Sequence, residues 1–286
     1  MNVPFKVNLK DQVALVTGGG GVLCSAMAQA LAVCGAKVAV TGFRKPEAAE
    51  TVAAEIRKAG GAAISIACNV VDKESLAAAN DKVKQELGPV DILINGAGGN
   101  HPKGTTSHEY LRKEDVSGAA KDLVTFYDLD PKGIESVFNL NFLGTLLPTQ
   151  AFTREMAGKG RGVVINISSM NAFRPLTKIP AYSGAKAAVS NFTQWLAVHF
   201  SKVGVRVNAI APGFFVTDQN RTLLTRPDGT WTPRANTILA HTPMGKFGVP
   251  EDLIGALLWL ASDEASGFVT GIVLPVDGGF AAFSGV

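Results

Sequence analysis

The sequence has few cysteines. Its 286 residues include only Cys24, Cys34 and Cys68, each among apolar neighbours. An odd number of cysteines in apolar surroundings is typical of buried thiols in a reducing compartment, not of a disulfide framework. We therefore expect free thiols and a cytoplasmic location.

The sequence also lacks long apolar runs and an excess of one charge. None of its apolar stretches approaches the roughly 18–20 residues that cross a bilayer. Residues 1–12 carry Lys6, Lys10 and Asp11 where a signal peptide would have an apolar core. The 27 basic and 24 acidic side chains give a net charge of only +3, and the basic residues are scattered. These absences predict no membrane span, no secretion and no nucleic-acid partner.

What the sequence does contain is apolar material for a large core. Hydrophobic residues make up 47% of the chain, and no shift in charge or complexity divides it, so residues 1–286 are expected to form one domain. Short β-branched runs alternate with longer segments of helical period. The expected strands cover 13–17, 37–41, 63–67, 91–95, 163–168 and 206–210, and the expected helices cover 25–34, 46–59, 73–87, 131–157 and 181–203.

This alternation predicts the fold class. Strands that are apolar on both faces and separated by helices form an α/β fold, a doubly wound parallel sheet of Rossmann type with helices on both faces. Two insertions, near 99–132 and 214–246, interrupt the rhythm after the carboxyl ends of strands. Ligands bind at that edge of open α/β sheets, so we expect the insertions to form the substrate side. Surface decoration or subunit contacts are the alternative.

A glycine-rich turn lies between the first strand and the first helix. Glycine there allows a sharp turn and close approach of a phosphate to the free amides at the start of the helix. Any tight turn can use glycines, but this position in a βαβ unit favours a dinucleotide cofactor. The turn residues expected to contact the cofactor are Gly18, Gly20, Gly21, Val22 and Leu23.

The end of the second strand reports on the cofactor's ribose. An acidic residue there would bind the 2′-hydroxyl of NAD and repel the 2′-phosphate of NADP. The sequence has no acid at this place and instead has Arg44 and Lys45. This pattern favours NADP(H), with NAD(H) as the alternative if both cations are merely solvated.

A proton-transfer group is expected on the helix at 181–203. Tyr182 and Lys186 are four residues apart and therefore share a helix face. A nearby ammonium stabilises a phenolate, so Lys186 would let Tyr182 exchange a proton with an alcohol or ketone. Ser169, at the end of the preceding strand, could donate a hydrogen bond to the developing oxyanion, and Asn141 could hold a water that joins Lys186 to solvent.

These spaced motifs, over essentially the whole chain, resemble the short-chain dehydrogenase/reductase family. The matching elements include the glycine turn, Asn95-Gly96-Ala97-Gly98, Pro212-Gly213 and the ending Pro275-Val276-Asp277-Gly278-Gly279. The resemblance implies a catalytic tetrad of Asn141, Ser169, Tyr182 and Lys186, and a homotetramer with the tail 280–286 at an interface. It also implies that Tyr182 and Lys186 contact the cofactor, together with Asn69, Val70, Asn95, Gly96, Ala97, Pro212, Gly213 and Thr217.

The chain departs from the family pattern at four positions. The family usually has glycine where Val22 and Cys24 stand, asparagine where Gly96 stands, and aspartate where Asn69 stands. Only Gly18 of the three signature glycines is matched in frame, although Gly19 to Gly21 supply flexibility. The departures bear on the geometry of the glycine turn more than on its role.

The substrate side resembles one branch of the family. A gap of 43 residues separates Gly98 from Asn141, and the insertion within it resembles that of fructuronate reductases and D-mannonate oxidoreductases. The resemblance implies a six-carbon sugar acid, whose carboxylate needs a cation and whose hydroxyls need polar partners. The expected substrate-binding residues are His101, Lys103, Asn171, Gln219, Asn220 and Arg221, with Arg174 and Lys178 as further candidates.

Two other interpretations stay open. Apolar side chains such as Phe173, Phe214, Phe215 and Trp231 could line a slot for an acyl chain, as in a 3-oxoacyl or steroid-like ketone reductase. A cofactor-binding sensor without turnover is the third interpretation, although it would not need Tyr182 and Ser169 together. The pattern of the sequence offers no metal site.

Overall fold

The computed structural model describes residues 6–117, 122–217 and 221–285. Seven parallel strands form one sheet in the order β3-β2-β1-β4-β5-β6-β7. The strands are β1 Val13–Thr17, β2 Lys37–Gly42, β3 Ala63–Ala67, β4 Ile92–Asn95, β5 Gly162–Ile167, β6 Val205–Pro212 and β7 Val273–Val276. The predicted doubly wound α/β fold is confirmed, with strand ends within one residue of the prediction except at β6.

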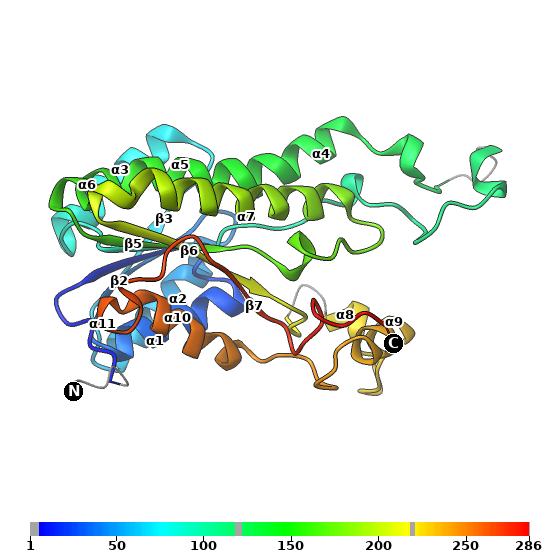
Figure 1. Cartoon of the computed structure of the whole chain (residues 1–286). Coiled ribbons are helices and arrows are strands. Elements are labelled where there is room, and N and C mark those ends of the chain that lie inside the picture. Colours follow the sequence, from blue (N-terminus) through cyan, green and yellow to red (C-terminus); the bar gives the residue numbers. More distant parts are fainter. Residues whose placement is uncertain (1–5, 118–121, 218–220, 286) are drawn as a thin grey trace.

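Helices cover both faces of this sheet (Figure 1). On one face lie α1 Val22–Val33, α2 Pro46–Lys58, α10 Ile254–Ala261 and α11 Asp263–Ser266. On the other lie α3 Lys73–Glu86, α4 Pro131–Phe138, α5 Gly144–Phe152, α6 Arg154–Lys159 and α7 Pro180–Phe200. The two faces have separate apolar cores, because alternate residues along each strand point to opposite faces. Val16 and Ile94, for example, belong to the first core, and Leu15 and Leu93 to the second.

The helix predicted over 131–157 is interrupted. A π-helical turn, Asn139–Leu143, separates α4 from α5, and α6 follows as a separate helix. Asn141 explains the interruption, because its side-chain Nδ2 donates to the Val137 carbonyl at 2.7 Å. A side chain that enters the backbone ladder in this way distorts a helix locally. The prediction of one continuous helix was therefore wrong.

Several carboxyl-terminal elements were not predicted. The strand β7 contains Pro275, which argues against a central strand, but β7 lies at the edge of the sheet, where a residue without an N–H is tolerated. The helices α8 Arg221–Leu224, α9 Pro233–Ala240 and α10 were also missed. The two insertions project from the same end of the sheet, beyond the carboxyl ends of the strands (Figure 1).

Candidate active site

The glycine turn packs tightly against its neighbours. Gly18 has a φ of +64°, and a Cβ there would lie 2.9 Å from the Ala97 Cα. A Cβ at Gly20 would lie 2.9 Å from the Ala48 Cβ. In the described structure Gly21 begins α1 without a side-chain cap, and the first turn of α1 carries no acidic residue. The turn therefore presents free backbone amides at the positive end of a helix, an arrangement that fits a cofactor phosphate.

The Cys24 side chain occupies the space that a side chain at Gly96 would need. A Cβ at Gly96 would overlap the Cys24 Sγ and would also lie 2.8 Å from the Thr17 carbonyl oxygen. The side chain that the family usually has at position 96 is thus replaced by the thiol from α1. The two departures from the family pattern compensate in volume, and the turn keeps its close contact with the loop after β4.

The loop after β4 is fixed by Thr17 at the end of β1. The Thr17 Oγ1 accepts hydrogen bonds from the Gly96 and Ala97 amides at 3.0 and 3.2 Å. Asn95 is buried, and its Nδ2 donates to Thr149 and Asn166 inside the protein. The Asn95 side chain thus ties β4 to α5 and β5, and its contact with a cofactor stays a prediction.

Other residues expected at the cofactor line the carboxyl edge of the sheet. Arg44 and Lys45 follow β2 as exposed side chains, and the Asn69 backbone amide donates to the Ser75 Oγ at 2.9 Å with Val70 buried beside it. Pro212 ends β6, and the amide of Gly213 donates to the Val276 carbonyl at 2.9 Å. A Cβ at Gly213 would lie 2.6 Å from the Asp277 Cα. Thr217 also lies in the described structure, after β6.

Tyr182 and Lys186 occupy the first turns of α7. The Lys186 Nζ lies 5.7 Å from the centroid of the Tyr182 ring and donates to the Ile167 carbonyl at 2.7 Å. Lys186 is only 4% exposed, and burial lowers its pKa to about 8. Burial also raises the pKa of the Tyr182 hydroxyl, while a side-chain hydrogen bond with Ser169 opposes that shift. We expected Lys186 to lower the pKa of the Tyr182 hydroxyl. In the protein alone, the pKa of this hydroxyl is instead raised.

The Ser169 hydroxyl is oriented by the turn that it begins. Its Oγ accepts the backbone amide of Asn171 at 3.2 Å. One acceptor position of the hydroxyl is thereby occupied, which leaves its proton for donation toward Tyr182 or a ligand. Ser169 lies directly beyond β5, so the sheet fixes the position of this turn.

Asn141 and Lys186 meet at Gly98. A Cβ at Gly98 would lie 2.7 Å from the Asn141 Oδ1 and 3.2 Å from the Lys186 Nζ. Asn141 is fully buried, and its amide also bonds the Gly99 backbone, accepting from N at 3.2 Å and donating to O at 2.7 Å. The structure thus brings together all four residues of the expected tetrad. Gly98 was not predicted as a site residue, although its place in Asn95-Gly96-Ala97-Gly98 was a signal.

The described members of the expected substrate-binding set lie on separate segments. The His101 Nδ1 accepts the Lys103 amide at 3.2 Å, and the Lys103 Nζ pairs with Asp130 at 3.2 Å. This ion pair joins the two ends of the insertion 99–132 beside the start of α4, and a substrate contact of Lys103 stays a prediction. Arg221 begins α8, and Gln219 and Asn220 lie outside the described residues.

Asn171 is buried beside Ser169. Its side chain is 4% exposed, and its Oδ1 has no hydrogen-bond partner within the described structure. A buried acceptor without a partner costs about 1–3 kcal/mol, so a polar ligand that supplied a donor would stabilise it. The unpaired Oδ1 supports the prediction that Asn171 binds substrate. The contacts of His101 and Arg221 give less support to the same prediction for those two residues.

The described residues contain neither a helix suited to a membrane nor a cluster suited to a metal ion. None of the helices there is long and apolar enough to cross a membrane. No group of three His, Cys, Asp or Glu side chains in the described part of the chain could hold a metal ion.

Comparison with known proteins places this arrangement in a family. Residues 12–228 match the family described as short chain dehydrogenase. A crystal structure from Haemophilus influenzae, provisionally described as a D-mannonate oxidoreductase with bound NAD, is 55% identical, with a TM-score of 0.93 over all of both chains.

Two further relatives cover nearly the whole chain. The uncharacterized oxidoreductase UxuB of Bacillus subtilis is 51% identical over 99% of this chain and 100% of its own. A gluconate 5-dehydrogenase from Burkholderia cenocepacia, in complex with NADP and tartrate, is 29% identical with a TM-score of 0.80, over 97% of this chain and 98% of its own. The chain belongs to the short-chain dehydrogenase/reductase family, as its motifs predicted. It is an enzyme of the NAD(P)-dependent oxidoreductase class.

Proposed function

We propose that the chain transfers hydride reversibly between a nicotinamide cofactor and a ketone or secondary alcohol of a six-carbon sugar acid, D-fructuronate or D-mannonate. The observation that carries the proposal is the gathering of Tyr182, Ser169, Lys186 and Asn141 at the carboxyl edge of the sheet. A sensor without turnover would need neither the Tyr182 hydroxyl nor the Ser169 hydroxyl beside it. This argues against the non-catalytic interpretation.

The proton chemistry follows from these contacts. In alcohol oxidation the Tyr182 oxygen takes the hydroxyl proton of the substrate, and in ketone reduction it returns a proton to the carbonyl oxygen. Ser169 donates a hydrogen bond to the oxygen that carries the developing charge. When bound, the cofactor would accept hydride in oxidation and supply it in reduction.

Lys186 is the ammonium proposed to assist Tyr182. Since its Nζ contacts the Ile167 carbonyl and approaches Asn141 at Gly98, it is held in place before any ligand binds. With a pKa of about 8, it carries a positive charge at neutral pH in a buried setting. That charge favours the phenolate form of Tyr182 whenever a ligand brings the two groups into a common network.

The proposed substrate rests on relatives and on Asn171. The Haemophilus protein is provisionally described as a D-mannonate oxidoreductase and the Burkholderia protein is described as a gluconate 5-dehydrogenase, so the descriptions of two relatives name sugar acids. The buried acceptor of Asn171 suits a substrate hydroxyl, and the insertions 99–132 and 214–246, within one proposed domain, supply the substrate side.

For the cofactor we propose acceptance of both forms with a preference for NADP(H). The exposed cations Arg44 and Lys45, at the end of β2, could bind a 2′-phosphate. The NAD bound by the Haemophilus relative shows that such a fold also accepts the form without this phosphate. Arg44→Ala should reduce the preference for NADPH over NADH by about tenfold. An unchanged ratio of NADPH affinity to NADH affinity would show that Arg44 is a solvated side chain that does not bind the 2′-phosphate.

A substrate panel tests the proposed reaction. The purified protein should change the absorbance of NAD(P)H with D-mannonate in one direction and D-fructuronate in the other. Turnover of 3-oxoacyl or steroid ketones but of no sugar acid would overturn the substrate. A cavity of about 190 Å³ is lined by Phe214, Phe215 and Met244, and also by the charged side chains of Lys246, Asp252 and Asp277. Its apolar side keeps such a substrate as the second candidate. The cytoplasmic location and the homotetramer stay predictions, which fractionation and light scattering would test.

A further inference from the structure

Arg174 is built into the turn that carries Ser169. The Ala172 amide donates to the Ser169 carbonyl at 3.0 Å, and the Phe173 and Arg174 amides donate to the Met170 carbonyl at 2.9 and 3.0 Å. Met170 is almost fully buried and anchors the turn in the protein. The backbone position of Arg174 is therefore fixed relative to the Ser169 hydroxyl.

The far end of the Arg174 side chain is fixed as well. Its Nε donates to the Ala281 carbonyl at 3.2 Å. The carboxylate of Asp277 holds that carboxyl-terminal turn by accepting the amides of Gly279 and Ala281 at 2.9 and 2.7 Å. The Phe280 ring packs edge-on against Phe214, with centroids 5.2 Å apart. The Arg174 side chain thus extends from the turn after β5, across the carboxyl edge of the sheet, and places its guanidinium at the turn after β7.

No acid among the described residues forms an ion pair with Arg174. The ion pairs of the described residues include none with Arg174, so its Nη1 and Nη2 edge has no carboxylate partner there. A guanidinium held through Nε keeps this edge for a carboxylate, which it binds through both oxygens.

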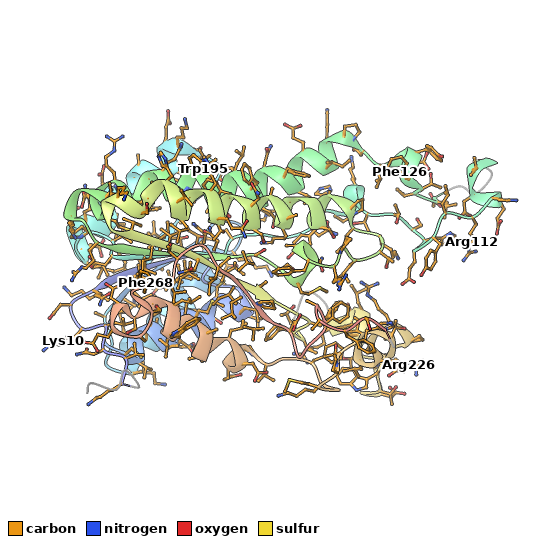
Figure 2. All side chains as sticks on the ribbon, in the orientation of Figure 1. Lys10, Arg112, Phe126, Trp195, Arg226 and Phe268 are labelled. Carbon is orange, nitrogen blue, oxygen red and sulfur yellow. The ribbon has the colours of Figure 1, made fainter. Side chains whose placement is uncertain are left out.

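Other cations on the substrate side are less suitable. Lys103 pairs with Asp130, and Lys246 lies 3.8 Å from Asp252. Lys178 lines a cavity with His108 and Asp115 inside the insertion 99–132. Arg112 lies at the far end of that insertion, well away from the sheet (Figure 2).

We propose that Arg174 is the specificity-determining residue that binds the substrate carboxylate, so that the enzyme selects anionic over neutral polyols and ketoses. The proposal rests on the proposed sugar-acid function and assigns its charge recognition to one side chain. A carboxylate held away from the reacting carbon contacts Arg174 equally in the ground state and the transition state. Loss of the Arg174 guanidinium should therefore raise KM and leave kcat nearly unchanged.

Steady-state kinetics of Arg174→Ala with D-mannonate test this assignment. KM should rise about 10- to 100-fold, because hydrogen bonds to charged groups are among the stronger ones. Arg174→Lys should recover only part of the loss, since an ammonium keeps the charge without the planar fork. Cofactor affinity, measured by fluorescence titration, should stay within about twofold and would report that the variant is folded. Slow turnover of the uncharged ketose fructose should be unaffected.

Lys82→Ala is the matched control, because it removes an exposed cation that is paired with Glu86 on α3, outside the expected substrate side. Its KM for D-mannonate should change less than about twofold. If Arg174→Ala leaves KM unchanged, or Lys82→Ala raises it as much, the assignment of Arg174 is overturned while the sugar-acid function stands. If the wild-type enzyme turns over no sugar acid, the proposed function itself fails, and the assignment fails with it.

Discussion

The tetrad and the substrate side are built in different ways. Asn141 and Lys186 are buried and bonded to backbone groups of the sheet and its loops, at Gly99 and Ile167. The substrate side consists mainly of loops and short helices, and its cations Lys103 and Arg174 are exposed. The difference fits the proposed division, in which the core fixes the groups that exchange the proton and exposed side chains on the surrounding turns and loops choose the substrate.

Among changes that displace the tetrad without removing any of its groups, the largest effect is expected at Gly98. In Gly98→Ala the new methyl would lie 2.7 Å from the Asn141 Oδ1 and 3.2 Å from the Lys186 Nζ, so both groups must move. A displacement of about 1 Å at a reacting centre can lower a rate about 100-fold, and we expect a loss of that size in kcat.

Gly99→Ala is the control for this change. A Cβ at Gly99 meets its nearest neighbour, the Leu140 side chain, at 3.7 Å, which is an ordinary contact. Turnover of Gly99→Ala should stay within about threefold of the wild-type rate. Equal rates for the two variants would show that the contact at Gly98 does not position the tetrad.

A second effect is expected where Cys24 meets Gly96. Gly96→Ala should weaken cofactor binding about tenfold, because the methyl would overlap the Cys24 Sγ. Adding Cys24→Ala should recover part of the loss, and the rest reflects the Thr17 carbonyl at 2.8 Å. Adding Cys34→Ala instead should recover nothing. Additive effects of Gly96→Ala and Cys24→Ala in cofactor titrations would contradict the compensation.

Burial of Lys186 predicts a dependence of stability on pH. Its pKa is about 8 in the folded protein against 10.5 as its ordinary value. Between these values the unfolded chain binds more protons, so stability gains about 1.4 kcal/mol per pH unit from this group as pH rises. The gain should be absent from Lys186→Met, and the comparison is best made from pH 8 to 9. There the folded-state Cys24 thiol, its pKa raised to about 11, stays protonated, and the cysteines of the unfolded chain ionise alike in both proteins, so their effect cancels. If the free energy of unfolding, measured with denaturant, changed equally with pH in both proteins over that range, Lys186 would not be titrating in the core.

The smallest effect is expected for the Lys103 pair with Asp130. The Lys103 side chain is 66% exposed, and an exposed ion pair contributes at most about 1 kcal/mol. Lys103→Ala should therefore change the free energy of unfolding by no more than that and leave the rate with D-mannonate intact. A large loss of turnover would place Lys103 in the substrate site and break the division between the two regions.

The sequence predicted the central sheet because its signals are local and repeated. Apolar runs such as 13–17 and 163–168 are buried as expected, and the glycine turn follows the first strand. The break in the helix over 131–157 could not be predicted, since it depends on Asn141 reaching back to the Val137 carbonyl.

The substrate side was predicted less well because contacts between distant segments decide it. The pairing of Lys103 with Asp130 joins residues 27 positions apart, and the bond from Arg174 to Ala281 joins residues 107 positions apart. Neither contact leaves a periodic signal in the chain. The compensation between Cys24 and Gly96 is of the same kind, because each residue taken alone was simply a departure from the family pattern.

The most direct test of the account is the rate of nicotinamide reduction by Tyr182→Phe with D-mannonate, measured beside its cofactor affinity. The substitution removes only the phenolic hydroxyl, and with it the exchangeable proton. We expect turnover to fall about 100- to 10,000-fold while the cofactor affinity stays within about threefold of the wild-type value. A Tyr182→Phe variant that kept a near-normal rate would contradict the central claim that Tyr182 exchanges the proton.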